Sequence, residues 1–289
     1  MRALPALTLL SAALLGGCVS VATHGDPAAA LGPPPDDSLN ATAWYQSLER
    51  ELISREVYRA AARQLDEALA DPRWDALPPA DRDNDPAGLA PAIIVDVDET
   101  VLDNSASQVR LIRSGASFDD AGWDAWVQER AAPPLAGAVE FLGEAARRGV
   151  TVFYISNRTV AQGDATVDNL RAAGFPIDDP GQFLGKGTVV AGCEGTGTDK
   201  GCRREQVGRQ YRVLMQFGDQ LGDFVDVTRN TREGRAAAMA PFAGWVGERW
   251  WILPNPVYGS WEPALFGNDW SLSPARRRAA KEAALDSRE

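Results

Sequence analysis

An α/β fold built on a parallel sheet is predicted by two features of this 289-residue sequence. From residue 92 onward, short apolar runs alternate with stretches of helical periodicity, an order typical of strand–helix–strand units. Hydrophobic residues make up 45% of the chain, which is enough for a sizeable buried core.

The predicted elements follow one another in a regular order. We expect one amphipathic helix from Thr42 to Ala70, where apolar residues recur near helical spacing. The predicted strands are Ala92–Val97, Val150–Ile155, Arg212–Phe217 and Trp250–Leu253. The helices predicted between them are Leu135–Arg148, Val160–Ala173 and Arg203–Gln210. The insertion from 105 to 133 is predicted to form a small helical cap, and the basic residues of the charged tail, 276–289, a solvated helix face.

The first eighteen residues are typical of a secretory signal. Arg2 precedes an apolar run, Ala3–Leu15, that is too short to span a bilayer comfortably. The segment Leu15-Gly16-Gly17-Cys18 resembles the bacterial lipobox, so we predict a signal peptide over residues 1–17 and a lipid anchor on Cys18. The alternative is an ordinary signal peptide with an incidental cysteine. Residues 18–40 are rich in Ala, Pro, Gly and Asp, and we expect a flexible tether there.

Charge and composition exclude several classes of function. The chain has 40 acidic and 29 basic residues, so a nucleic acid polymer is a poor partner. The single histidine, His24, lies in a low-complexity stretch, which leaves no Ser-His-Asp triad or His-rich zinc site for the folded part. None of the three cysteines is followed six residues later by arginine, which excludes a cysteine phosphatase.

Carboxylates follow two of the predicted strands. Asp96 and Asp98 end the first strand, and Asp219 and Asp223 follow the third. In open parallel sheets the ligand site lies beyond the carboxyl ends of the strands. Burying several carboxylates there costs several kcal/mol unless a cation compensates them. Oxygen-only ligands suit Mg²⁺, and the lack of nearby histidine argues against zinc.

Hydrogen-bond donors accompany these carboxylates. Ser156, Asn157 and Arg158 follow the second predicted strand, and Lys200 lies in a glycine-rich loop. An isolated Asp-x-Asp can be a simple turn, and Asp223 can simply cap a helix. The convergence of three strand ends instead favours a site that combines a nucleophile, metal ligands and donors for phosphate oxygens.

These motifs, in this order, resemble the haloacid dehalogenase superfamily of phosphatases and, more narrowly, the class C bacterial acid phosphatases. The matching segments are Asp96–Asn104, Ile155–Arg158, Asp199–Arg204, Gly218–Phe224 and Leu253–Glu262. The resemblance implies a Rossmann-like parallel sheet core, flanked by helices and carrying a smaller helical cap, in a phosphatase domain over residues 41–275. It also implies hydrolysis of phosphomonoesters, such as nucleoside 5'-monophosphates and aryl phosphates, with Mg²⁺.

The resemblance assigns the chemical steps and the metal ligands. Asp96 attacks phosphorus and forms an aspartyl-phosphate, while Asp98 protonates the leaving oxygen and then activates water. Asp96, the backbone carbonyl of Asp98 and Asp219 bind Mg²⁺. Asp223 either binds Mg²⁺ through a water molecule or supports the residues that bind it directly.

The remaining site residues bind the substrate. Ser156 and Lys200 hold phosphoryl oxygens, and Asn157 and Arg158 orient the pocket. The resemblance also implies that two aromatic side chains, Phe118 and Tyr258, sandwich a flat leaving group. We interpret Trp123 and Trp126 as ordinary cap core.

Several alternatives stay open at this point. Cys193 and Cys202 either form a disulfide in an oxidising periplasm or stay as two buried thiols. The same site could serve a sugar phosphatase, a phosphotransferase or a metal-binding surface lipoprotein without catalysis. Val19 lacks the acidic character that the resemblance links to inner-membrane retention, so we expect the outer membrane. The sequence is compatible with a monomer and with a homodimer.

Overall fold

The computed structural model describes residues 38–195 and 197–286. The predicted signal peptide, the lipid-bearing Cys18 and most of the tether lie outside these ranges, so they stay predictions. Within the described ranges, no helix combines the length and the apolar character needed to cross a bilayer.

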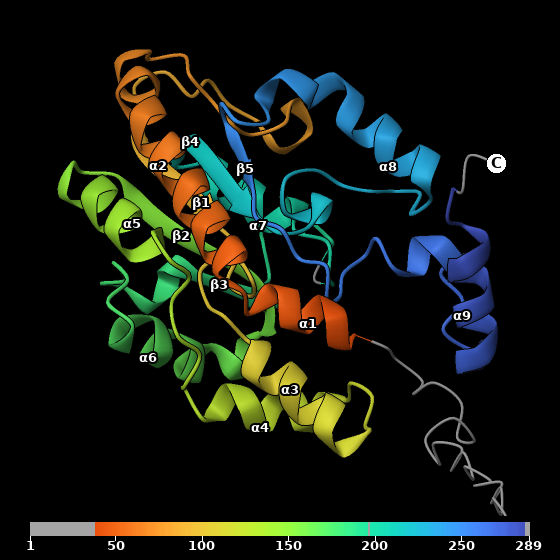
Figure 1. Cartoon of the computed structure of the whole chain (residues 1–289). Helices are drawn as coiled ribbons and strands as arrows, with labels where there is room; N and C mark the ends of the chain where they lie inside the picture. Colours follow the sequence, from red (N-terminus) through yellow and green to blue (C-terminus); the bar gives the residue numbers. More distant parts are fainter. Residues whose placement is uncertain (1–37, 196, 287–289) are drawn as a thin grey trace, which may run out of the picture. The chain divides into compact units, whose positions relative to one another are not determined.

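The core is a five-stranded sheet in the order β3-β2-β1-β4-β5, with every neighbouring pair parallel. The strands are β1 Ala90–Val95, β2 Thr151–Thr159, β3 Phe183–Lys186, β4 Tyr211–Gly218 and β5 Trp250–Ile252. The chain moves outward from β1 through β2 to β3, then crosses back to β4 and β5 on the other side of β1 (Figure 1). In α/β folds, ligands bind at the carboxyl ends of the strands on either side of such a reversal, which here are β1 and β4. The predicted fold class is confirmed.

Helices cover both faces of the sheet. The α-helices are α1 Leu39–Tyr45, α2 Leu48–Ala70, α3 Ser105–Ser114, α4 Asp120–Gln128, α5 Ala138–Arg147, α6 Gly163–Ala172, α7 Gly201–Gly208, α8 Arg232–Met239 and α9 Pro274–Ala283. In β1, Ile93 and Val95 pack into the core beneath α2 and α5, while Ala92 and Ile94 pack on the opposite side with Val207 of α7. Successive side chains of a strand point to opposite faces, so a continuous apolar run is what a strand buried on both faces requires.

The expected single helix from 42 to 70 is wrong. The chain forms two helices, α1 and α2, which are separated at Gln46 and Ser47. Ser47 adopts an extended conformation, and its hydroxyl accepts a hydrogen bond from the backbone N–H of Arg50 at 3.4 Å. A serine in this geometry starts a new helix because it satisfies a donor that the first turn leaves unpaired.

Two elements were not predicted, the edge strand β3 and helix α8. With four residues, β3 is too short to show an alternation, and it contains Gly185. A Cβ atom at Gly185 would lie only 2.8 Å from the carbonyl oxygen of Arg158. The glycine therefore allows the edge strand to approach the segment of β2 that carries site residues.

The predicted cap and tail both contain helices. The insertion from 105 to 133 holds α3 and α4, which lie together in Figure 1. Part of the tail belongs to α9, which begins at Pro274, two residues before the expected boundary at 276. This helix has no buried residue.

Candidate active site

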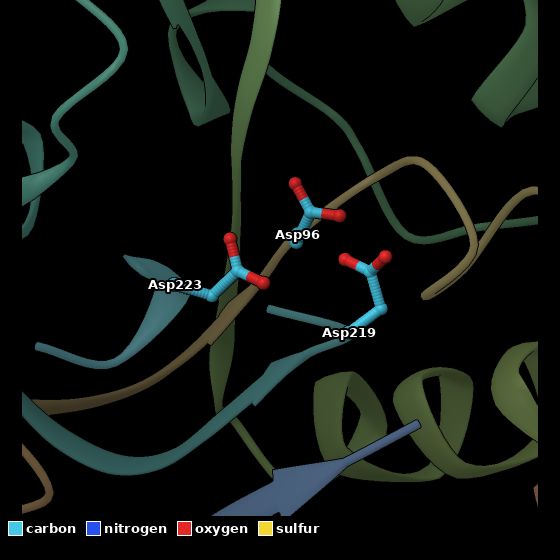
Figure 2. A group of neighbouring side chains, drawn as sticks. All are labelled: Asp96, Asp219 and Asp223. Carbon is cyan, nitrogen blue, oxygen red and sulfur yellow. The ribbon is translucent and has the colours of Figure 1, made fainter. Parts of the chain in front are cut away.

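Three carboxylates from separate segments gather at the carboxyl end of the sheet. Asp96 follows β1, Asp219 follows β4, and Asp223 ends the single turn η5, Leu221–Asp223. One oxygen from each lies within 4.8 Å of the others, and Figure 2 shows the three groups side by side. The backbone N–H of Asp96 donates to the carbonyl of Phe217 at 2.9 Å. The pairing of β1 with β4 therefore extends to the site itself and positions Asp96 relative to Asp219.

Lys200 places a buried positive charge among these carboxylates. It is the N-cap residue of α7 and is 3% exposed. Its Nζ donates to Asp96, and to Asp223 at 2.7 Å. Asp223 also accepts a hydrogen bond from the backbone N–H of Gln220 at 2.8 Å. Asp223 thus closes the turn η5 from within and belongs to the acidic group as well, whereas the alternative interpretation expected it to cap a following helix.

The electrostatics of the acidic group favour a bound cation. Burial raises the pKa of Asp96 to about 7; Lys200 opposes this shift, and Asp223 and Asp98 add to it. Burial, with Asp223 and Asp96, also raises the pKa of Asp219 well above its ordinary value. Counting Asp98, four carboxylates are accompanied by two cationic side chains, Lys200 and Arg158. One divalent cation would balance the remaining charge.

The carboxylate of Asp98 has hydrogen-bond partners of its own. It accepts hydrogen bonds from the Nε of Arg158 at 3.0 Å and from the amide of Asn104 at 2.9 Å, and the Nη2 of Arg158 lies at 2.8 Å. The hydroxyl of Ser156 donates to its second oxygen at 3.4 Å. Asp98 and Asp96 therefore have different hydrogen-bond partners, although the two residues belong to one motif.

Asn104 was part of the motif, but its role was not predicted. Its side chain is fully buried, and its carbonyl oxygen accepts hydrogen bonds from the indole of Trp126 at 2.8 Å and from Arg158 at 3.2 Å. Trp126 is buried, as expected of cap core, yet it also connects helix α4 to the group that holds Asp98. A buried amide with all its hydrogen-bonding groups satisfied rigidifies such a network.

The segment around Lys200 is held by a disulfide and by Arg203. Cys193 and Cys202 form the disulfide, with their Cα atoms 5.8 Å apart, so the loop before Lys200 is joined to the first turn of α7. The Nη2 of Arg203 donates to the side chain of Asn157 at 2.9 Å and to the carbonyl of Asp199 at 2.8 Å. Asn157 is exposed and serves here as a partner of Arg203.

The two aromatic residues predicted to bind a flat leaving group occupy different settings. Phe118 is 60% exposed, and its ring centroid lies 6.3 Å from that of Trp123. Tyr258 is half-buried, and its backbone carbonyl accepts a hydrogen bond from Gln220. No ring contact between the two is found among the described residues. The sandwich therefore stays a prediction.

The raised pKa values predict how the stability of the metal-free protein depends on pH. Because the folded state retains protons on Asp96 and Asp219 that the unfolded chain loses near pH 4, the free energy of unfolding should fall between about pH 4 and pH 7. Asp219→Asn removes one of these groups, so the free energy of unfolding of this variant should fall less steeply with rising pH than that of the wild type. Thermal unfolding in chelator at several pH values checks this. Parallel curves for the two proteins would contradict it.

The parallel sheet with an acidic group at its carboxyl end is the arrangement that the phosphatase interpretation of the sequence expects, and comparison with known proteins specifies the family. The family model for "HAD superfamily, subfamily IIIB (Acid phosphatase)" matches residues 55–261. The chain belongs to this family and is a phosphomonoesterase.

Curated and solved relatives agree. The chain is 26% identical over 275 residues to "Acid phosphatase 1" of Solanum lycopersicum, covering 89% of this chain and 99% of the relative. It is similar to the class C acid phosphatase from Bacillus anthracis, with a TM-score of 0.74, 32% identity, and coverage of 88% of this chain and 98% of that one. A second structure of that enzyme, with tungstate bound, gives a TM-score of 0.75 and 31% identity over the same shares. The resemblance inferred from the motifs is confirmed.

Proposed function

We propose that this protein is a Mg²⁺-dependent acid phosphatase that hydrolyses small phosphomonoesters, such as nucleoside 5'-monophosphates and aryl phosphates, by way of a phosphoryl group carried on Asp96. The observation that supports this most is the meeting of Asp96, Asp219, Asp223 and Lys200 at the carboxyl ends of β1 and β4. The relative from Bacillus anthracis that binds tungstate, a tetrahedral oxyanion like phosphate, supports the same class of ligand.

Asp96 and Asp98 divide the chemistry between them. A carboxylate oxygen of Asp96 attacks phosphorus while the leaving oxygen takes a proton from Asp98. Asp98 then accepts a proton from the water that hydrolyses the aspartyl-phosphate. Arg158 orients the carboxylate of Asp98 through its two donors. Because the first step needs the protonated form, we expect an acidic optimum.

Ser156 and Lys200 provide donors for the phosphoryl oxygens. Both are buried, at 0% and 3% exposure, so their positions are restricted before substrate arrives. Preorganised donors of this kind stabilise the charge that develops in the transition state. Lys200, which already contacts Asp96, lies where a phosphoryl group on that carboxylate would need a cation.

The acidic group fits Mg²⁺. Its ligand atoms are carboxylate oxygens, which hard cations prefer, and the two cysteines of the described chain are held in the disulfide. When bound, Mg²⁺ supplies the positive charge that reduces the repulsion between Asp96 and an incoming phosphate.

Hydrolysis of a chromogenic aryl phosphate by the purified protein, with and without Mg²⁺, tests this proposal. We expect turnover at acidic pH that disappears with excess chelator and returns with added Mg²⁺. Full activity in excess chelator, or an alkaline optimum, would contradict the roles of the acidic group or of Asp98.

We also propose that the enzyme is held in the bacterial cell envelope, at the outer membrane, by a lipid on Cys18. This rests on the sequence of residues 1–18 alone. Cys18→Ser should release the protein from the membrane fraction, and retention of that variant would oppose the proposal.

A further inference from the structure

Two amide side chains hold the carboxylate of Asp219. The Nδ2 of Asn255 donates to its Oδ2 at 2.7 Å, and the Nε2 of Gln220 donates to the same oxygen at 2.9 Å. Hydrogen-bond donors to a metal-binding carboxylate orient it, and their removal typically lowers the affinity for the metal by about 10–100-fold. Neither amide was identified from the sequence as a site residue.

Both amides also hold one loop, residues 255–261, which carries Tyr258. The Oδ1 of Asn255 accepts hydrogen bonds from the backbone N–H groups of Val257 at 2.9 Å and Tyr258 at 3.4 Å. The Nε2 of Gln220 donates to the carbonyl of Tyr258 at 3.3 Å, and its Oε1 accepts from the N–H of Ser260 at 3.1 Å. Asn255 therefore places its nitrogen on Asp219 and its oxygen on the 255–261 loop, while the nitrogen of Gln220 contacts both Asp219 and the loop and its oxygen contacts the loop.

The packing of this loop against Gln220 is close. Gly259 adopts a φ of 152°, and a Cβ atom there would lie 2.3 Å from the amide of Gln220. Only glycine allows the backbone to approach the side chain this closely. Movement of the Gln220 amide therefore requires movement of the loop.

We propose that Gln220 and Asn255 are positioning residues that couple metal binding at Asp219 to the order of the 255–261 loop. The proposal rests on the proposed function for the metal. A cation at Asp219 restrains the carboxylate, the carboxylate restrains both amide groups, and their oxygens restrain the N–H groups of Val257, Tyr258 and Ser260. Such coupling is reciprocal, so an ordered loop also raises the affinity for the metal. The loop that carries Tyr258 should then open less often in the metal-loaded enzyme.

Hydrogen–deuterium exchange of the full chain with Mg²⁺ alone, without substrate, tests this directly. The amides of Val257, Tyr258 and Ser260 are the donors in the coupling, so their exchange measures it. We expect Mg²⁺ to slow exchange of the 255–261 loop about fivefold or more in the wild type. Mg²⁺ affinity is measured in parallel by calorimetry on the metal-free protein.

Two variants and a matched control separate coupling from general damage to the loop. In Asn255→Leu and in Gln220→Leu, Mg²⁺ affinity should fall about tenfold or more, and the effect of Mg²⁺ on loop exchange should disappear. Asn230→Leu is the control, because Asn230 donates to the carbonyl of Ser260 at 2.7 Å and makes no described contact with Asp219. In Asn230→Leu the 255–261 loop should exchange faster than in the wild type. Its affinity for Mg²⁺, and the slowing of loop exchange by Mg²⁺, should be retained. If circular dichroism shows that Asn255→Leu does not fold, Gln220→Leu decides alone.

The contrary outcomes are distinct. Mg²⁺ that binds the wild type and leaves loop exchange unchanged overturns the coupling, as does Gln220→Leu with wild-type Mg²⁺ affinity. An absence of Mg²⁺ binding overturns the proposed metal, and a wild type that hydrolyses no phosphomonoester overturns the proposed function.

Discussion

Asp96→Asn should reduce the kcat for phosphomonoester hydrolysis by about 10⁴-fold or more, a loss of the size seen when a nucleophile is removed from other hydrolases. The amide has the shape of the carboxylate but lacks the charge needed to attack phosphorus. The fold should persist, because the backbone contact of residue 96 with Phe217 does not depend on the side chain. Steady-state kinetics and circular dichroism on the same preparation measure both.

Asp103→Asn is the matched control. Asp103 lies seven positions further on, where its side chain accepts a hydrogen bond from the N–H of Ser105 at 2.8 Å and pairs with Arg50 at 3.3 Å, and it is not a member of the acidic group. This variant should keep a kcat within a few-fold of the wild type. An Asp96→Asn variant with near-normal turnover, or equal losses in both variants, would show that Asp96 is not the nucleophile.

The second large effect concerns Asp98 and depends on the leaving group. Asp98→Asn cannot donate the proton, so kcat for a nucleoside 5'-monophosphate, whose leaving alkoxide is a strong base, should fall by about 10²–10⁴-fold. A nitrophenyl phosphate leaves as a stabilised phenolate and should lose much less in the phosphorylation step. The ratio of the two losses, measured as kcat/KM with each substrate, is therefore the informative quantity. Equal losses would mean that Asp98 orients the site without acting as the acid.

The central strands and the main site residues were predictable because they depend on local pattern and topology. Ile93 and Val95 face one layer of the core while Ala92 and Ile94 face the other, and only a continuous apolar run satisfies both. Once the strand ends are known, parallel pairing brings the residues that follow them together. Asp96 and Asp219 converge for this reason although 123 positions separate them.

The remaining features depend on contacts that no local pattern encodes. Strand β3 exists because Gly185 permits a close approach to the backbone of Arg158. The break between α1 and α2 depends on how Ser47 caps the second helix. Asn104, Gln220 and Asn255 are amides that acquire their roles from partners elsewhere in the chain. Such residues become visible only when the fold has placed their partners.

The covalent step on Asp96 is the central claim, and chemical trapping tests it most directly. Borohydride reduces an aspartyl-phosphate to homoserine, so enzyme quenched during turnover and then reduced should carry homoserine at position 96 in a mass spectrum of its peptides. We predict this change in the presence of substrate and Mg²⁺, more strongly where hydrolysis of the intermediate is slowed, as in Asp98→Asn with nitrophenyl phosphate. Phosphate released at a normal rate with residue 96 unmodified, or with the label on another residue, would contradict the account.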